Sequence, residues 1–181
     1  MAYKIKLSLS KSSIDDTRAT IKALRNEFDK LPSIINHAVA KECEEKMLSN
    51  HDDFIESLPK DPYPHYALTR VVDKKDSSTA TIIGEQVIYD EFGTGDVGAR
   101  NPHPEKSKYN LNDYSSGPYV SNHEDEQGHY WNFEGYKLYG VPAGKFVYNT
   151  IVEMKNGEAK KIAEKQVINS LNKTLGGGGD K

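Results

Sequence analysis

Histidines and carboxylates occur together in the C-terminal half of the chain, and both are residue types that bind divalent metals. Three of the six histidines lie there, His103, His123 and His129, and the acidic run Glu124-Asp125-Glu126 lies between the last two. A metal site built on one helix needs two histidines four residues apart, and this segment lacks that spacing. The sequence therefore favours a solvated acidic loop and no metal site, with a metal-dependent hydrolase using His123, Glu124 and His129 as the alternative.

Two other patterns could indicate catalysis or cofactor binding, but the residues around them do not suit either function. Cys43 is the single cysteine, and acidic neighbours on both sides raise a thiol pKa, so we expect a small core or interface residue. The run Gly93-Thr94-Gly95-Asp96-Val97-Gly98 fits the dinucleotide-binding pattern, but Pro102 and Pro104 follow where a helix would have to open at the third glycine. We therefore expect no catalytic residue, no cofactor and no enzyme activity.

Tyrosines are the other residues with recognition chemistry. Tyr109, Tyr114 and Tyr119 lie in a segment of Gly, Pro, Asn and charged residues, with more aromatic residues beyond it. Aromatic rings can stack on bases, but the interleaved acidic residues repel a phosphate backbone, and a net charge of -3 supplies no basic field. We expect these three tyrosines to contact a protein partner, and keep a nucleic-acid-binding module as the alternative.

Helical periodicity dominates the N-terminal third. Residues 3–9 alternate as in a short strand, and Ser13 then provides an N-cap for a helix. One apolar row follows at helical spacing: Ile14, Ile21, Leu24, Phe28, Leu31 and, further on, Met47. Pro32 predicts a kink or a break, and the polar and proline-rich residues 50–64 predict an irregular linker.

Strand-forming residues dominate the middle of the chain. Segments 66–73 and 78–92 are rich in Thr, Val, Ile and Tyr and flank a short polar turn, which predicts an antiparallel hairpin. A further strand is expected over 128–139. Between them, residues 99–127 lack periodicity and predict a long variable loop, mobile in the free chain and ordered by a partner.

The remaining elements complete an α+β fold. A helix should open near Lys145, and Asn156-Gly157 should interrupt it. We expect one domain over residues 1–175, an antiparallel β-sheet of about four strands packed against a long N-terminal helical arm and a C-terminal helix. Residues 176–181 should form a flexible glycine-rich tail.

Composition agrees with a foldable, polar chain. At 181 residues, about 70% of the unfolded surface can be buried. Charged residues make up 28%, the mean hydropathy is -0.73, and no run approaches the roughly 18 apolar residues of a membrane span. We expect no membrane association, cytosol-like conditions and no internal disulfide.

Twelve residues carry a resemblance to a known family. The segment Tyr89–Gly95, followed by Gly98, Pro-His-Pro, a tryptophan and Gly-x-Pro-x-x-x-Phe, resembles the tail-completion or head–tail joining (neck) proteins of long-tailed bacteriophages. The matching positions are Glu91, Phe92, Gly93, Thr94, Gly95, Pro102, His103, Pro104, Trp131, Gly140, Pro142 and Phe146. Within a strand ending at this motif, Gly93 and Gly95 would adopt positive φ, and Glu91 would be a structural carboxylate on the face of Val87 and Tyr89.

The resemblance implies a non-enzymatic virion structural protein. Members form rings, commonly hexameric, at the phage neck, where they complete the tail and join it to the head connector. The implied partners are further copies of the chain, a head connector or stopper protein, and a tail tube or tail terminator protein. DNA would pass through the ring without specific binding. The implied location is the head–tail junction of the virion, with the host cytoplasm during assembly.

Overall fold

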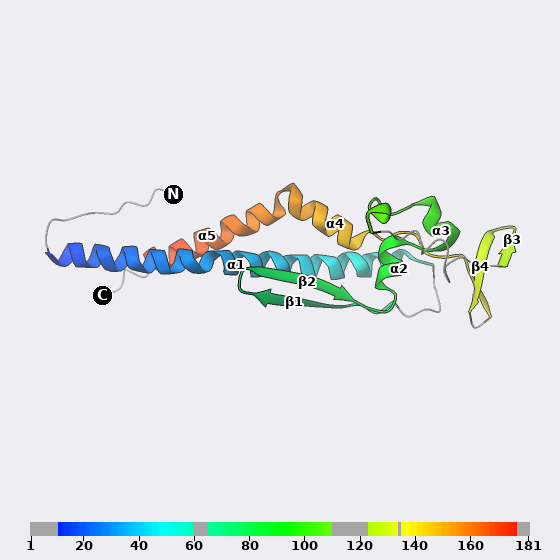
Figure 1. The fold of residues 1–181 in the computed structure, drawn as a ribbon, viewed down its shortest axis with the longest axis horizontal. Helices are drawn as coiled ribbons and strands as arrows, with labels where there is room; N and C mark the ends of the chain where they lie inside the picture. Colours follow the sequence, from blue (N-terminus) through cyan, green and yellow to red (C-terminus); the bar gives the residue numbers. More distant parts are fainter. Residues whose placement is uncertain (1–10, 60–64, 110–122, 134, 177–181) are drawn as a thin grey trace.

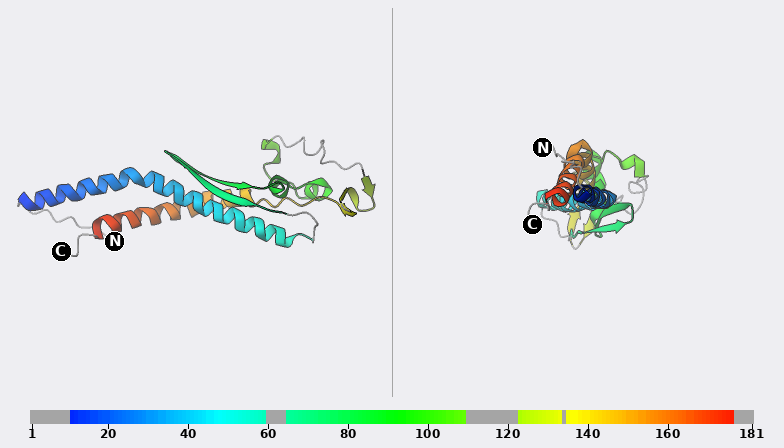
Figure 2. Two further views of the ribbon diagram at one scale, coloured as in Figure 1. Left: turned by 90° about the horizontal axis from the view of Figure 1, so that it is seen from below. Right: turned by 90° about the vertical axis from the view of Figure 1, so that its left-hand side faces the viewer.

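A computed structural model describes residues 11–59, 65–109, 123–133 and 135–176. The molecule is elongated around one long helix, α1 (Lys11–Ser57) (Figure 1). Helices from the C-terminal part lie along one side of α1 and a β-hairpin lies along the other, an arrangement that the end-on view of Figure 2 repeats. The predicted α+β class is confirmed. The expected strand over residues 3–9 lies outside the described residues.

Helix α1 is longer than the sequence predicts. It already includes the expected cap Ser13, and it continues through the residues that predict a linker as far as Ser57. Pro32 lies inside the helix without breaking it. The left view of Figure 2 shows α1 bent in its blue part, as expected where a proline removes one helical hydrogen bond.

Strands β1 (Leu68–Lys74) and β2 (Ser77–Ile83) form the predicted hairpin, and both pack on α1. The hairpin ends earlier than expected. Residues Val87–Phe92, predicted as the end of the second strand, form the short helix α2. That strand prediction is wrong, and so is the face shared by Val87, Tyr89 and Glu91 that it implied. The β-branched and aromatic residues of this segment favour a strand locally, but tertiary contacts decide its conformation.

Two further short helices occupy the expected loop. Helix α3 (Gly95–Arg100) opens at the second glycine of the Gly-x-Gly-x-x-Gly run and ends before Pro102, and a 3-10 helix, η1 (Lys106–Tyr109), follows. No helix opens at the third glycine, as expected; the helix that opens at the second glycine is only 6 residues long. Expected loop 99–127 is thus partly regular, and residues 110–122 lie outside the description.

A second sheet lies beyond the C-terminal end of α1 (Figure 1). It consists of β3 (His123–Asp125), β4 (Gly128–Phe133) and β5 (Tyr136–Leu138), paired antiparallel in the order β3-β4-β5. Residues 128–139, expected to form one strand, therefore form the two strands of a hairpin, β4 and β5. The strands divide between sheets of two and three strands, where the sequence predicted a single sheet of about four.

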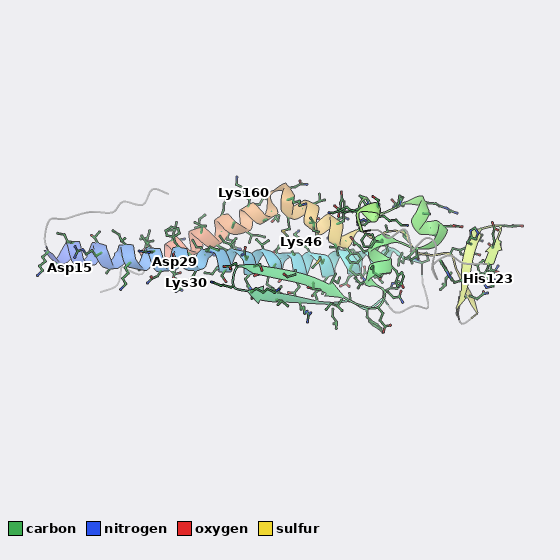
Figure 3. All side chains as sticks on the ribbon, viewed as in Figure 1. Asp15, Asp29, Lys30, Lys46, His123 and Lys160 are labelled. Carbon is green, nitrogen blue, oxygen red and sulfur yellow. The ribbon has the colours of Figure 1, made fainter. Side chains whose placement is uncertain are left out.

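The C-terminal helices return along α1. Helix α4 (Phe146–Glu153) begins where predicted, and α5 (Ala159–Gly176) follows after a π-helical turn, η3 (Met154–Glu158). Gly157 has φ 121° within that turn, which accounts for the predicted interruption. Figure 3 shows Lys46 of α1 on the side facing α4, where its Nζ lies 2.8 Å from a carboxylate oxygen of Glu153.

The hydrophobic core is small. Among the described residues, the buried hydrophobic side chains lie where α1 meets α4 and α5: Leu31, Ala40, Met47, Ala143, Phe146 and Met154. Phe146 is fully buried, whereas Ile14, Ile21 and Phe28 of the predicted apolar row are exposed. Cys43 is half-buried, and burial together with the charge of Glu42 raises the pKa of its thiol. Among the described helices, none combines the length and apolar character needed to cross a membrane.

Candidate functional site

Two adjacent carboxylates are buried at the C-terminal end of α2. Asp90 is 1% exposed and Glu91 is 5% exposed. Three histidines from separate segments lie against them: His51, His65 and His103. We call these five residues the carboxylate cluster. Because an unpaired buried charge is costly, each carboxylate requires the partners that the fold brings to it.

Asp90 connects α2 to α1. Its Oδ2 lies 3.4 Å from Nε2 of His51, and its Oδ1 lies 2.9 Å from Nδ1 of His65. Burial alone would raise the pKa of Asp90, but the hydrogen bonds with the two histidines outweigh burial and lower it below the ordinary carboxyl value. The ring of His51 also packs edge-on against Phe146, with centroids 4.9 Å apart, so this end of α1 contacts the start of α4.

Glu91 caps α4. Its Oε2 accepts the backbone N–H of Val147 at 2.9 Å, and its Oε1 accepts that of Tyr148 at 3.0 Å. These N–H groups belong to the first turn of the helix, where no carbonyl within the helix is available to them. A carboxylate there also interacts favourably with the helix dipole. Glu91 is therefore a satisfied structural carboxylate, as expected, although it lies on a helix and not on a strand.

His103 completes the cluster from the Pro-His-Pro segment. Its Nδ1 accepts the backbone N–H of Glu105 at 3.0 Å, so its Nε2 carries the proton and donates to Oε1 of Glu91 at 3.0 Å. The ring lies 4.4 Å from that of Phe92 and 5.3 Å from that of Tyr148 between centroids. His103 is 4% exposed, and the exposed Pro102 and Pro104 flank it.

Backbone hydrogen bonds also join residues 90–94 to residues 141–145. The carbonyl oxygens of Asp90 and Glu91 accept the N–H groups of Gly144 at 2.7 Å and Lys145 at 3.2 Å. Thr94 donates its N–H to the carbonyl of Val141 at 2.9 Å, and its Oγ1 accepts the N–H of Val141 at 3.2 Å. Residues 90–94 and 141–145 are thus held together along their length.

Glycines allow this close approach. Gly93 and Gly95 have φ of 74° and 59°, which confirms the predicted positive values. A Cβ on Gly93 would lie 2.7 Å from the backbone nitrogen of Ala143, and one on Gly140 would lie 2.1 Å from the carbonyl oxygen of Thr94. The ring of Trp131 packs on Gly95, where a Cβ would lie 2.9 Å from Cζ3.

The motif residues identified from the sequence therefore come together. Residues 91–95, His103 and the segment from Gly140 through Pro142 to Phe146 meet at or beside the carboxylate cluster, and Trp131 packs on Gly95. The candidate interface tyrosines do not join them. Tyr109 ends η1, and Tyr114 and Tyr119 lie outside the described residues.

The histidines of the metal hypothesis lie elsewhere. The ring of His123 stacks on that of Tyr130 in the β3-β4-β5 sheet, with 5.5 Å between the ring centroids. Figure 3 shows this sheet at one end of the molecule, opposite the end that carries Asp15. His129 contacts Asp96, with Nδ1 3.2 Å from Oδ2, and Glu124 is its partner in the β3–β4 register. Within the part of the chain that the structure describes, no three or more His, Cys, Asp or Glu side chains are grouped as metal ligands would be.

Sequence reasoning missed three members of the carboxylate cluster. His51 lies in the segment read as a linker, and His65 follows the proline-rich residues, so neither carries a local signal. Asp90 lies within the family motif but is not one of its matching positions. Both carboxylates are buried and hydrogen-bonded. Their hydrogen bonds connect α1, α2, α4 and the Pro-His-Pro segment to one another.

Comparisons of the chain with protein-family models, with curated proteins and with solved structures find no match.

Loss of the Glu91 carboxylate should destabilise the chain. In Glu91→Ala, two partly buried N–H groups of α4 and the Nε2–H of His103 lose their acceptor, which should lower the free energy of unfolding by about 3 kcal/mol. Glu91→Gln keeps one acceptor oxygen and should lose less. Urea denaturation measures both, with Glu85→Ala as the control at an exposed glutamate nearby. Unfolding free energies of the Glu91 variants equal to that of the control would contradict the capping role.

Substitution of Gly140 tests the close backbone contact between residues 140 and 94 separately from backbone strain. Gly140 and Gly135 have similar φ values, 95° and 87°, but a Cβ on Gly135 meets nothing within 4 Å. Gly135→Ala should therefore cost only the strain of a left-handed residue, about 1–2 kcal/mol, whereas Gly140→Ala adds a collision with backbone. Thermal melting of the two variants should give a clearly lower midpoint for Gly140→Ala. Equal midpoints would show that residues 94 and 140 are not packed as described.

Proposed function

We propose that this chain is a non-enzymatic virion structural protein that forms a ring at the neck of a long-tailed bacteriophage. In this role it completes the tail and joins it to the head connector. The partners proposed are further copies of the chain in a hexameric ring, a head connector or stopper protein, and a tail tube or tail terminator protein. DNA passes through the ring without specific binding.

The observation that carries the proposal is the convergence of the twelve motif residues. They span 56 positions from Glu91 to Phe146, yet Glu91, His103 and Phe146 meet at one buried cluster, and the glycines of the pattern allow the backbone contact beside it. Glu91 caps α4, Gly93 and Gly140 allow backbone contact, and His103 pairs with Glu91. A pattern that is coherent in space supports the resemblance more strongly than the same residues scattered over the molecule would.

Exposed apolar side chains support an assembled state. Among the described residues, exposed large hydrophobic side chains outnumber the buried ones, and they are distributed over several elements. Examples are Ile21 (55% exposed) and Phe28 (51%) on α1, Leu68 (75%) on β1 and Ile168 (53%) on α5. Burial of these side chains against neighbouring copies would remove apolar surface from water and stabilise the proposed assembly. The interface role of Tyr109, Tyr114 and Tyr119 remains part of the proposal.

Charge supports passage of DNA over binding. Each chain carries a formal charge of -3, so a ring of identical copies has a negative total charge. Specific or tight DNA binding draws its affinity from Lys and Arg neutralising phosphates, and this chain has no excess of them.

Location and stoichiometry test the proposal together. Native mass spectrometry of the purified chain should give an assembly six times the 20.3 kDa chain mass. Gold-coupled antibody against the chain should label phage particles at the head–tail junction in electron micrographs, and pre-absorption of the antibody with purified chain should remove the label. Single chains at every concentration, together with label absent from the junction, would overturn the proposal.

A further inference from the structure

The β1–β2 hairpin has two open edges. Each strand pairs only with the other, and no further strand or backbone hydrogen bond from the described residues joins either one. In an antiparallel strand, every second residue directs its N–H and C=O groups away from its partner, so both outer edges present unpaired donors and acceptors. A sheet of only two strands is also marginal in stability, and gains from additional strands.

The edge of β2 lacks the features that normally block strand addition. Its sequence, Ser-Ser-Thr-Ala-Thr-Ile-Ile, contains no charge, no proline and no glycine, and its pairing with β1 runs without a bulge. Natural edge strands are usually protected by charged side chains, prolines or bulges. Strand β1 is different, because it carries Arg70, Asp73 and Lys74.

Contacts with α1 fix the conformation of the hairpin before any further strand is added. One face of it packs on α1, and its turn is tied to the same helix at two points. His37 Nδ1 lies 2.8 Å from Oδ2 of Asp73, and the Asn36 side chain donates to the carbonyl of Asp76 at 3.2 Å. Little order therefore has to be gained when a strand is added, which favours association.

We propose that the open edge of β2 binds the β1 strand of a second copy of this chain. The inference rests on the proposed ring and names the strands that form its contact. Copies related by rotation about a ring axis keep their strand directions along that axis, so β2 meets the neighbour's β1 antiparallel. This head-to-tail pairing uses both open edges of every copy and continues from chain to chain until the ring closes.

Charge and side-chain chemistry favour this occupant over the alternatives. Pairing of β1 with β1 would bring two charged strands together, whereas the uncharged β2 places no like charge opposite Arg70 or Lys74. Pairing of β2 with β2 would stop at two copies and leave both β1 edges open. On the outer face, Leu68 (75% exposed), Val72 (39%) and Ile83 (48%) would gain neighbours on the added strand.

Disulfide formation between mixed single-cysteine variants tests the pairing. In a Cys43→Ser background, one variant carries Thr79→Cys on β2, and three others carry Leu68→Cys, Arg70→Cys or Val72→Cys on β1, all at exposed positions. No variant can form a disulfide within its own chain. Oxidation of one mixture should give covalent dimers containing one chain of each kind, and the three β1 positions cover neighbouring registers. Circular dichroism verifies that each variant folds.

Native mass measured on the same samples separates this inference from the proposed function. Mixed dimers within a ring support both. A ring without mixed dimers overturns the strand pairing and leaves the ring standing, and mixed dimers in a two-chain complex support the pairing but contradict the ring. Dimers from the Thr79→Cys variant alone would show β2 pairing with β2 and would overturn the choice of β1. Single chains without any cross-link would overturn both.

Discussion

The structure depends on the burial of two adjacent negative charges, Asp90 and Glu91. A buried carboxylate is tolerated only with hydrogen-bond partners, and here they come from elements distant in the sequence. His51 lies on α1, His103 lies beyond α3, and the N–H groups of Val147 and Tyr148 open α4. The requirement to satisfy Asp90 and Glu91 therefore fixes where the C-terminal part of α1, α2 and the start of α4 meet.

From this meeting point, the molecule extends in two directions. On one side, α1 and the returning helices α4 and α5 form a helical body that carries the β1–β2 hairpin, and on the other, α3 leads to the β3-β4-β5 sheet (Figure 1). The helical body has a small core and leaves Ile14, Ile21 and Phe28 exposed. An elongated body with little internal core and open strand edges agrees with the proposed assembly of neighbouring copies.

Much of the fold is predictable because it is local. The helical conformation of α1, the hairpin and the start of α4 near Lys145 each follow from spacing or turn chemistry over a few residues. The failures have a common physical origin. Val87–Phe92 has strand-like composition but is helical, since short segments are decided by tertiary contacts such as the bond from the Gly144 N–H to the Asp90 carbonyl. The pairing of His51 with Asp90 joins residues 39 positions apart, and no local pattern announces it.

Amide hydrogen exchange at Val147 and Tyr148 tests the central claim most directly. If Glu91 caps α4 inside the fold, both amides exchange only when the whole domain unfolds, and their protection should match that of residues in the middle of the helix, such as Thr150. Uncapped first-turn amides have no acceptor and exchange quickly. Slow exchange at both positions, measured by NMR on the unsubstituted chain, is the result that the structure predicts. Fast exchange at Val147 and Tyr148 beside a protected Thr150 would contradict it.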